Sequence, residues 1–189
     1  LHKAIRRQRQ MCKETDAHHP TEIAATLHAA LNYPHKTLWC IFQPHTYTRT
    51  KAFLPQFAKS LALADKVILA DIYAARETDT LGISSADLQA LVQKEGKECF
   101  YFHTFEEIED FVLKNCINGD LLITMGAGDV VNIGENLLSD NLSTLSTART
   151  WKTFLSGCGY FFPKKDDISA PLTIFYTFST LSTFLSRYP

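Results

Sequence analysis

The segment "TLWCIFQPHTYTRTKAF", residues 37–53, indicates the fold class of this 189-residue chain. Its first part, residues 37–42, is continuously apolar, as a strand covered on both faces must be. A polar stretch follows, and then apolar residues recur at i, i+3, i+4 and i+7 from Leu54 to Leu61, which is the spacing of a helix. A buried strand followed directly by a helix is the repeating unit of α/β proteins.

The same alternation continues on both sides of this segment. Apolar periodicity and turn residues predict helices at 20–33, 84–96, 104–116 and 130–138, and strands at 66–72, 98–102 and 120–126. Thr104 and Glu107 have the spacing of a capping box at the start of the third of these helices. Strands separated by helices of this length predict a parallel sheet with right-handed crossovers, so we expect a doubly wound, Rossmann-like α/β domain flanked by helices.

Composition excludes several broad classes of protein. The formal net charge of -1 argues against a chain-wide attraction to nucleic acid or to an anionic membrane, so neither is expected as a partner. No apolar run approaches the roughly 18 residues needed to span a bilayer. The five cysteines are odd in number, widely spaced and without a C-x-x-C pair, which indicates reduced thiols and a cytoplasmic protein.

The two ends of the chain differ from its middle. Residues 1–15 form a basic segment that is compatible with a basic arm, an amphipathic targeting segment or the unpacked end of a fragment. Residues 139–189 are rich in Ser and Thr, with aromatic residues but no sustained period, and we expect them to be poorly ordered and to pack poorly against the sheet. Since residue 1 is Leu, we expect the chain to be a fragment, with its folded domain at residues 16–138.

Polar residues follow three of the predicted strands. Ligands of open α/β sheets bind outside the carboxyl ends of the strands, and parallel strands bring those ends to one edge. We therefore expect a binding site at that edge. The residues at the strand ends are Gln43, Pro44, His45, Asp71, Tyr73, Gly126, Gly128 and Asp129.

Arg49 lies in the first turn of the helix that follows the first of these strands. A cation at that position opposes the helix dipole, so it favours an anionic ligand nearby. A surface role without a ligand is the alternative.

His18 and His19 precede the helix at 20–33, and a helix N-terminus suits an anion. Adjacent His residues in a loop point to different sides, so a shared metal ion is not expected. The turn "GAGD", residues 126–129, lacks both G-x-G-x-x-G and a following Lys, so it is no phosphate loop.

Four motifs, in this order and spacing, resemble the C-terminal domain of the Mur ligases. They are "DAHHPTEI" (16–23), "FQPHTYTRTKAF" (42–53), "DIYAARETDTLGIS" (71–84) and "ITMGAGDV" (123–130). The resemblance is strongest to the branch of the family that joins L-alanine to UDP-N-acetylmuramate in peptidoglycan synthesis. It implies that ATP phosphorylates the lactyl carboxylate of UDP-N-acetylmuramate and that the amine of L-alanine attacks the acyl phosphate.

The resemblance also implies roles for residues and cofactors. His45 and Arg49 would hold the incoming amino acid, and a guanidinium can bind a carboxylate with two parallel hydrogen bonds. His18 and His19 would lie near the nucleotide and the reacting centre as catalytic residues. The remaining substrate-binding residues would be Tyr73, Glu77, Gly126, Gly128 and Asp129.

ATP and magnesium would be bound mainly by a central domain of the intact enzyme, and neither is expected to bind tightly to this chain alone. Two interpretations follow. The chain is the amino-acid-positioning domain of such a ligase, without independent activity, or it is a non-enzymatic Rossmann-type binding module.

Overall fold

The computed structural model describes residues 19–117, 119–126, 129–143, 151–156 and 172–177. The helices are α2 (Pro20–Ala30), α3 (Tyr47–Ala52), α4 (Leu54–Leu61), α5 (Ser85–Lys94), α6 (Phe105–Asn115) and α7 (Val130–Ser143). The strands are β1 (Leu38–Gln43), β2 (Lys66–Leu69), β3 (Glu98–Tyr101), β4 (Leu121–Gly126), β5 (Trp151–Ser156) and β6 (Leu172–Thr177). They form one parallel sheet in the order β3-β2-β1-β4-β6-β5.

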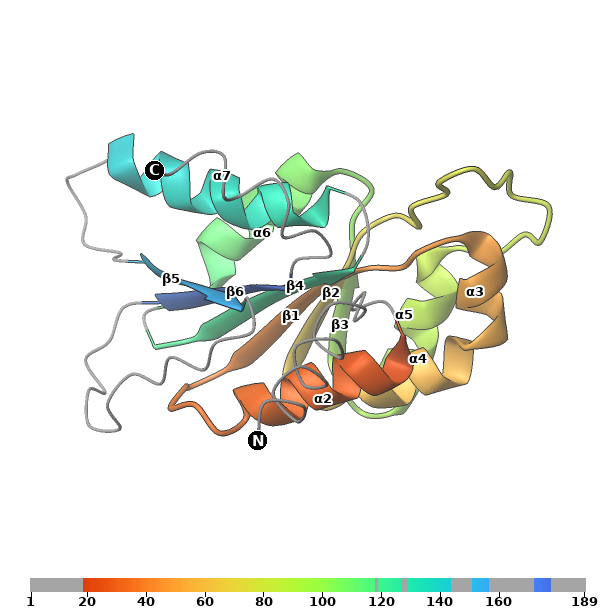
Figure 1. Ribbon diagram of the computed structural model, residues 1–189, viewed down its shortest axis with the longest axis horizontal. Helices are drawn as coiled ribbons and strands as arrows, with labels where there is room; N and C mark the ends of the chain where they lie inside the picture. Colours follow the sequence, from red (N-terminus) through yellow and green to blue (C-terminus); the bar gives the residue numbers. More distant parts are fainter. Residues whose placement is uncertain (1–18, 118, 127–128, 144–150, 157–171, 178–189) are drawn as a thin grey trace, which may run out of the picture.

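Helices cover both faces of this sheet, as the continuously apolar strands predict. Along β1, Cys40 and Phe42 pack into a core with α2, α4 and α5, whereas Trp39 and Ile41 pack into a second core with α6 and α7. Figure 1 shows α6 and α7 on one side of the sheet and α2 and α4 on the other. The expected doubly wound α/β fold is confirmed.

The chain changes direction across the sheet between β1 and β4. From β1 it proceeds outward through β2 to β3, and then returns to pair β4 with the opposite side of β1. Such a topological switch point is where open α/β sheets bind ligands. The register pairs Gln43 with Gly126, so the carboxyl ends of β1 and β4 meet at one edge.

Gly126 is required by this close approach of two backbones. Its φ is +130°, and a Cβ atom built there would lie 2.3 Å from the carbonyl oxygen of Gln43. Any side chain at this position would therefore force β1 and β4 apart at the switch point.

Two segments near the C-terminus differ from the sequence-based expectation. We expected residues 139–189 to pack poorly against the sheet, but β6 pairs with β4 and β5 pairs with β6. The segments "WKTFLS" and "LTIFYT" are rich in aromatic and β-branched residues, which favour strands, and β4 offers them an unpaired edge. A single short strand gives no sustained period, so the sequence pattern did not reveal them. The basic segment at residues 1–15 lies outside the described residues.

Within the part of the chain that the structure describes, no helix is both long enough and apolar enough to cross a membrane.

Candidate functional site

The connections that leave β1 and β2 stay together beyond the edge of the sheet. His45 and Tyr73 form an isolated parallel bridge, in which the N–H of Thr46 donates to the carbonyl of Tyr73 at 2.9 Å and the N–H of Tyr73 donates to the carbonyl of Pro44 at 2.9 Å. The rings of His45 and Tyr73 stack, with centroids 5.9 Å apart and planes inclined by 16°. Two residues predicted for the site from separate strand ends are therefore in contact.

Arg49 lies on α3, which begins four residues after the end of β1. The side chain is half-buried, and among the described residues no carboxylate lies within ion-pair distance of its guanidinium. A half-buried cation without an anionic partner is available to an anionic ligand. Arg49 can therefore bind a carboxylate or a phosphate.

Glu77 is hydrogen-bonded to the first turn of α3. Its Oε2 accepts a hydrogen bond from the backbone N–H of Thr48 at 3.0 Å, and its Oε1 accepts one from the Thr48 hydroxyl. These hydrogen bonds, that from the hydroxyl first, hold the pKa of the Glu77 carboxyl below its ordinary value. Glu77 is therefore ionised at neutral pH and bonded to the helix that presents Arg49.

His19 lies at the same end of the sheet as α3. It is the N-cap of α2, with its backbone N–H donating to Glu22 at 3.2 Å, and its ring packs edge-on against Phe53 with centroids 5.1 Å apart. Phe53 is the C-cap of α3. The helix therefore brings His19 to the end of α3 opposite the Glu77 contact, while His18 lies outside the described residues.

The glycine turn after β4 is described in part. Gly126 is paired with Gln43 at the switch point, and Asp129 is exposed, its carbonyl accepting from the N–H of Asn132 at 2.8 Å. Gly128 lies outside the described residues.

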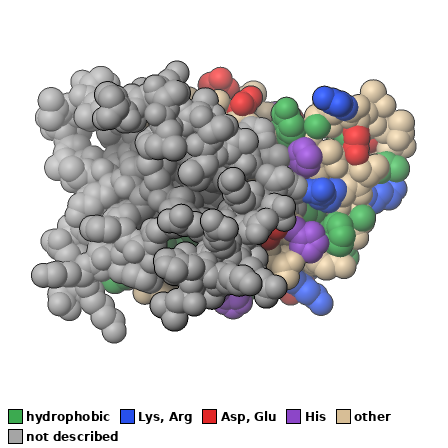
Figure 2. Space-filling view, viewed as in Figure 1, with side chains coloured by type: hydrophobic (Ala, Val, Ile, Leu, Met, Phe, Trp, Pro, Cys, Tyr) green, Lys and Arg blue, Asp and Glu red, His purple; other side chains and the backbone are tan. Residues whose placement is uncertain are grey.

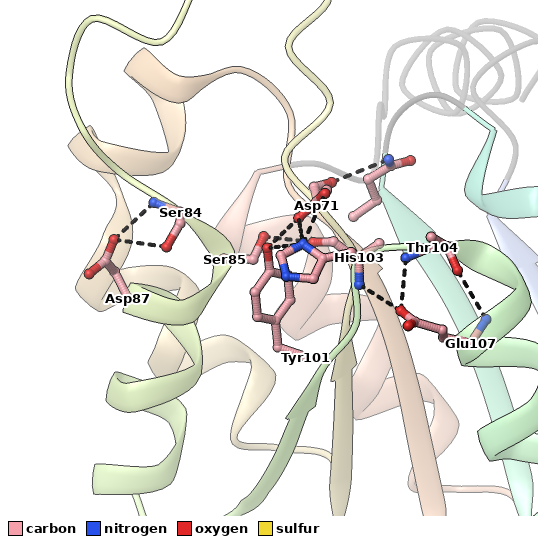
Figure 3. A network of polar contacts seen from close by, with 10 residues as sticks. Asp71, Ser84, Ser85, Asp87, Tyr101, His103, Thr104 and Glu107 are labelled. Atoms are coloured by element: carbon pink, nitrogen blue, oxygen red, sulfur yellow. Dashed lines mark hydrogen bonds and ion pairs between the residues drawn. The ribbon is translucent and has the colours of Figure 1, made fainter.

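A polar cluster at the ends of β2 and β3 extends the predicted site (Figure 3). Asp71 was among the predicted strand-end residues, whereas Tyr101 and His103 were not. The Tyr101 hydroxyl donates to Asp71, and His103 Nδ1 lies 3.3 Å from Asp71 Oδ1 and 3.1 Å from the Tyr101 hydroxyl oxygen. Burial, followed by the hydrogen bond to Asp71, raises the pKa of the Tyr101 phenol. The strand-end rule that selected His45 would have found Tyr101 and His103 had it been applied to the third strand.

This cluster is connected to the switch point through the backbone. Gln43 Nε2 donates to the carbonyl of Asp71 at 3.3 Å, and Ser85 Oγ donates to the carbonyl of Ala70 at 2.6 Å. Polar side chains thus bridge the carboxyl ends of β1 and β2 and the N-terminus of α5.

Charges of both signs are mixed around this end of the molecule. Figure 2 shows His, basic and acidic side chains interspersed over the described end at which α3 lies. Among the described residues, no three His, Cys, Asp or Glu side chains are placed to hold a metal ion.

Comparison with known proteins gives one consistent result. Residues 9–128 match the family model described as "Mur ligase, glutamate ligase domain". The chain is 65% identical over 122 residues to the UDP-N-acetylmuramate–L-alanine ligase of Lachnospira eligens and 66% identical over 122 residues to that of Lachnoclostridium phytofermentans. These alignments include 65% of this chain but only 27% and 26% of the two relatives.

A solved structure of UDP-N-acetylmuramoyl-L-alanyl-D-glutamate–2,6-diaminopimelate ligase has the same fold. It superposes with a TM-score of 0.54 over 68% of this chain and 29% of that one, at 19% sequence identity.

Proposed function

Since this chain belongs to the Mur ligase family, whose glutamate ligase domain matches residues 9–128, we propose that it positions the incoming amino acid in an ATP-dependent ligase. The ligase would join L-alanine to UDP-N-acetylmuramate, as the names of the two bacterial relatives state for those enzymes. The chain spans about a quarter of their length, so it would contribute one domain to the complete reaction.

The observation that supports this proposal most strongly is the placement of Arg49. Arg49 lies on α3, six residues beyond the end of β1, and its guanidinium has no ion-pair partner among the described residues. L-Alanine has a carboxylate, and a guanidinium binds that group with two parallel hydrogen bonds. His45, stacked on Tyr73, would border the same binding site.

The chemical contribution of this domain would be orientation. A carboxylate held by Arg49 fixes the direction of the α-amine, so that the amine meets the activated carboxyl of UDP-N-acetylmuramate in a productive geometry. In this proposal Gly126, Gly128 and Asp129 border the substrate from the β4 side, and His18 and His19 approach the nucleotide and the reacting centre from the start of α2.

ATP and magnesium would be held mainly by other parts of the complete ligase. ATP would activate the carboxyl group of UDP-N-acetylmuramate, and magnesium would neutralise the charge of the ATP phosphates. We do not expect either ATP or magnesium to bind tightly to this domain alone.

We propose the cytoplasm as the location of this activity. Cys40 in β1 and Cys99 in β3 are buried free thiols, which suits a reducing compartment.

A chimeric ligase would test the proposal. In it, the matching 122-residue segment of the Lachnospira eligens enzyme is replaced by that of this chain. We expect the chimeric ligase to join radioactive L-alanine to UDP-N-acetylmuramate in the presence of ATP and magnesium. A folded chimera that binds ATP but forms no such product, beside an active parent enzyme, would refute the proposal.

A further inference from the structure

Helix α3 lacks the usual means of satisfying its own N-terminus. It is six residues long, contains no acidic residue in its first turn, and its N-cap Thr46 makes no side-chain capping hydrogen bond. Thr46 also has a φ of 57°, which is uncommon for a β-branched residue and costs conformational energy. A short helix that begins in this way depends on partners from elsewhere in the fold.

Glu77 supplies that partner from the connection between β2 and α5. Its two carboxylate oxygens accept from the N–H and from the hydroxyl of Thr48, a residue 29 positions away in the sequence. The same connection is bound to α3 a second time, where Lys51 Nζ donates to the carbonyl of Leu81 at 3.3 Å. The anionic carboxylate also complements the positive end of the helix dipole.

Arg49 is the next residue after Thr48. Thr48 and Arg49 lie in the same turn of α3. A change in the backbone conformation of that turn therefore also changes the direction of the Arg49 guanidinium. We infer that Glu77 is a positioning residue, whose carboxylate caps α3 and thereby fixes the direction in which Arg49 presents its guanidinium to the amino-acid carboxylate. This inference rests on the proposed function.

The alternative is that Glu77 contacts the substrate itself. Both of its oxygens are engaged by Thr48. In addition, a carboxylate that faced the substrate carboxylate would repel it, whereas a carboxylate bound to a helix N-terminus is neutralised in part by the dipole. The geometry therefore favours an action of Glu77 through Thr48.

Amide hydrogen exchange in the full 189-residue chain tests the capping step without reference to any substrate. Glu77→Ala should accelerate exchange at the amides of Thr48 and Thr50 by roughly threefold to thirtyfold, the range expected for a lost helix cap. Glu77→Gln keeps a side-chain carbonyl for Thr48 but loses the charge, so it should accelerate exchange less than Glu77→Ala. Unchanged exchange in Glu77→Ala would overturn the inference.

Asp87→Ala provides a matched control. Asp87 caps α5 on the same side of the sheet, where its Oδ2 accepts from the N–H of Ser84 at 2.9 Å. Its loss should accelerate exchange at the start of α5 and leave the amides of α3 unchanged. Equal acceleration of α3 in both variants would indicate general destabilisation and would overturn the inference.

Kinetics of the chimeric ligase test the positioning step. Glu77→Ala should raise the KM for L-alanine roughly threefold to tenfold while the KM for ATP stays within about twofold. Glu77→Gln should raise the KM for L-alanine less than Glu77→Ala does. If Glu77→Gln is as damaging as Glu77→Ala, the charge acts on the substrate directly and the inference is wrong. If Glu77→Ala accelerates amide exchange in α3 but leaves the KM for L-alanine unchanged, Glu77 does not position Arg49 for the substrate.

The two proposals fail in different ways. A chimeric ligase that is inactive with the wild-type domain contradicts the proposed function and, with it, the positioning of a substrate by Glu77. The exchange experiment would still decide whether Glu77 caps α3.

Discussion

The rings of His45 and Tyr73 lie parallel, at 5.9 Å between centroids, above the carboxyl ends of β1 and β2. The two residues are joined through the backbone as well, because Thr46 and Tyr73 exchange hydrogen bonds with the opposite connection. This pair fixes one wall of the candidate site, and Tyr73 keeps 40% of its surface exposed.

Removal of the Tyr73 ring should release the imidazole of His45. We expect Tyr73→Ala to shift the ring-proton resonances of His45 and to raise the KM for L-alanine in the chimeric ligase about threefold to tenfold, in line with the roughly 0.5 to 1.5 kcal/mol of an aromatic pair. Tyr73→Phe preserves the stack and is the control. A change of KM of equal size in both variants would mean that the hydroxyl matters and the stack does not.

Gly126→Ala should destabilise the domain strongly. The added methyl group would lie 2.3 Å from the carbonyl oxygen of Gln43, at a φ of +130° that is strained for any side chain. We expect a loss of roughly 2 to 4 kcal/mol in the free energy of unfolding, measured by urea denaturation. Gly82→Ala serves as the control, because φ is also positive there but a Cβ atom meets nothing within 4 Å. Equal losses in the two variants would contradict a special requirement at the switch point.

The Glu77 contact predicts a specific dependence on pH. Because the pKa of the Glu77 carboxyl is lowered from its ordinary value of 4.5, the cap contributes stability above that value and loses it as the pH falls through the lower, folded-state pKa. No charged side chain among the described residues forms an ion pair with Glu77. The carboxyl carbon resonance of Glu77 should therefore titrate below 4.5, together with the amide of Thr48. A titration at or above 4.5 would contradict the capping contact.

Cys40 and Cys99 should be unreactive in the folded chain. Burial raises the pKa of the Cys99 thiol to about 12, and burial, followed by the Coulombic effect of Cys99, raises the pKa of the Cys40 thiol. At a pH of about 8, both should resist iodoacetamide for hours and react after denaturation, because the thiolate is the nucleophile. Peptide mass spectrometry separates the two sites from the other cysteines. Rapid native labelling of either residue would contradict its place in the core.

The sequence predicted the part of the fold that rests on local pattern. The apolar run at 37–42 became β1, shifted by one residue, and the capping box of Thr104 and Glu107 is present at the start of α6. The switch point follows from the order of strands in space, which no local pattern contains. The sequence did predict that the residues after β1, β2 and β4 meet at one edge of the sheet, because the carboxyl ends of parallel strands share an edge.

Contacts between distant segments were beyond prediction from the sequence. The hydrogen bond from Thr48 to Glu77 joins residues 29 positions apart. Neither the apolar periodicity nor the spacing of charges in the sequence indicates that these two residues are in contact. The strands β5 and β6 are short, and their place depends on the edge that β4 leaves open. The roles in catalysis or substrate binding of all the predicted site residues stay predictions. These residues are His18, His19, His45, Arg49, Tyr73, Glu77, Gly126, Gly128 and Asp129.

Substitution of Arg49 by Lys in the chimeric ligase tests the central claim most directly. Lysine keeps the charge but loses the planar, two-pronged geometry, so a bidentate contact worth about 1.5 to 3 kcal/mol should be lost in large part. The KM for L-alanine should then rise roughly tenfold to hundredfold while the KM for ATP changes little, and the exposed Arg76, substituted in the same way, should have no effect. An unchanged KM for L-alanine in a normally folded Arg49→Lys enzyme would contradict the assignment of this site to the amino-acid substrate.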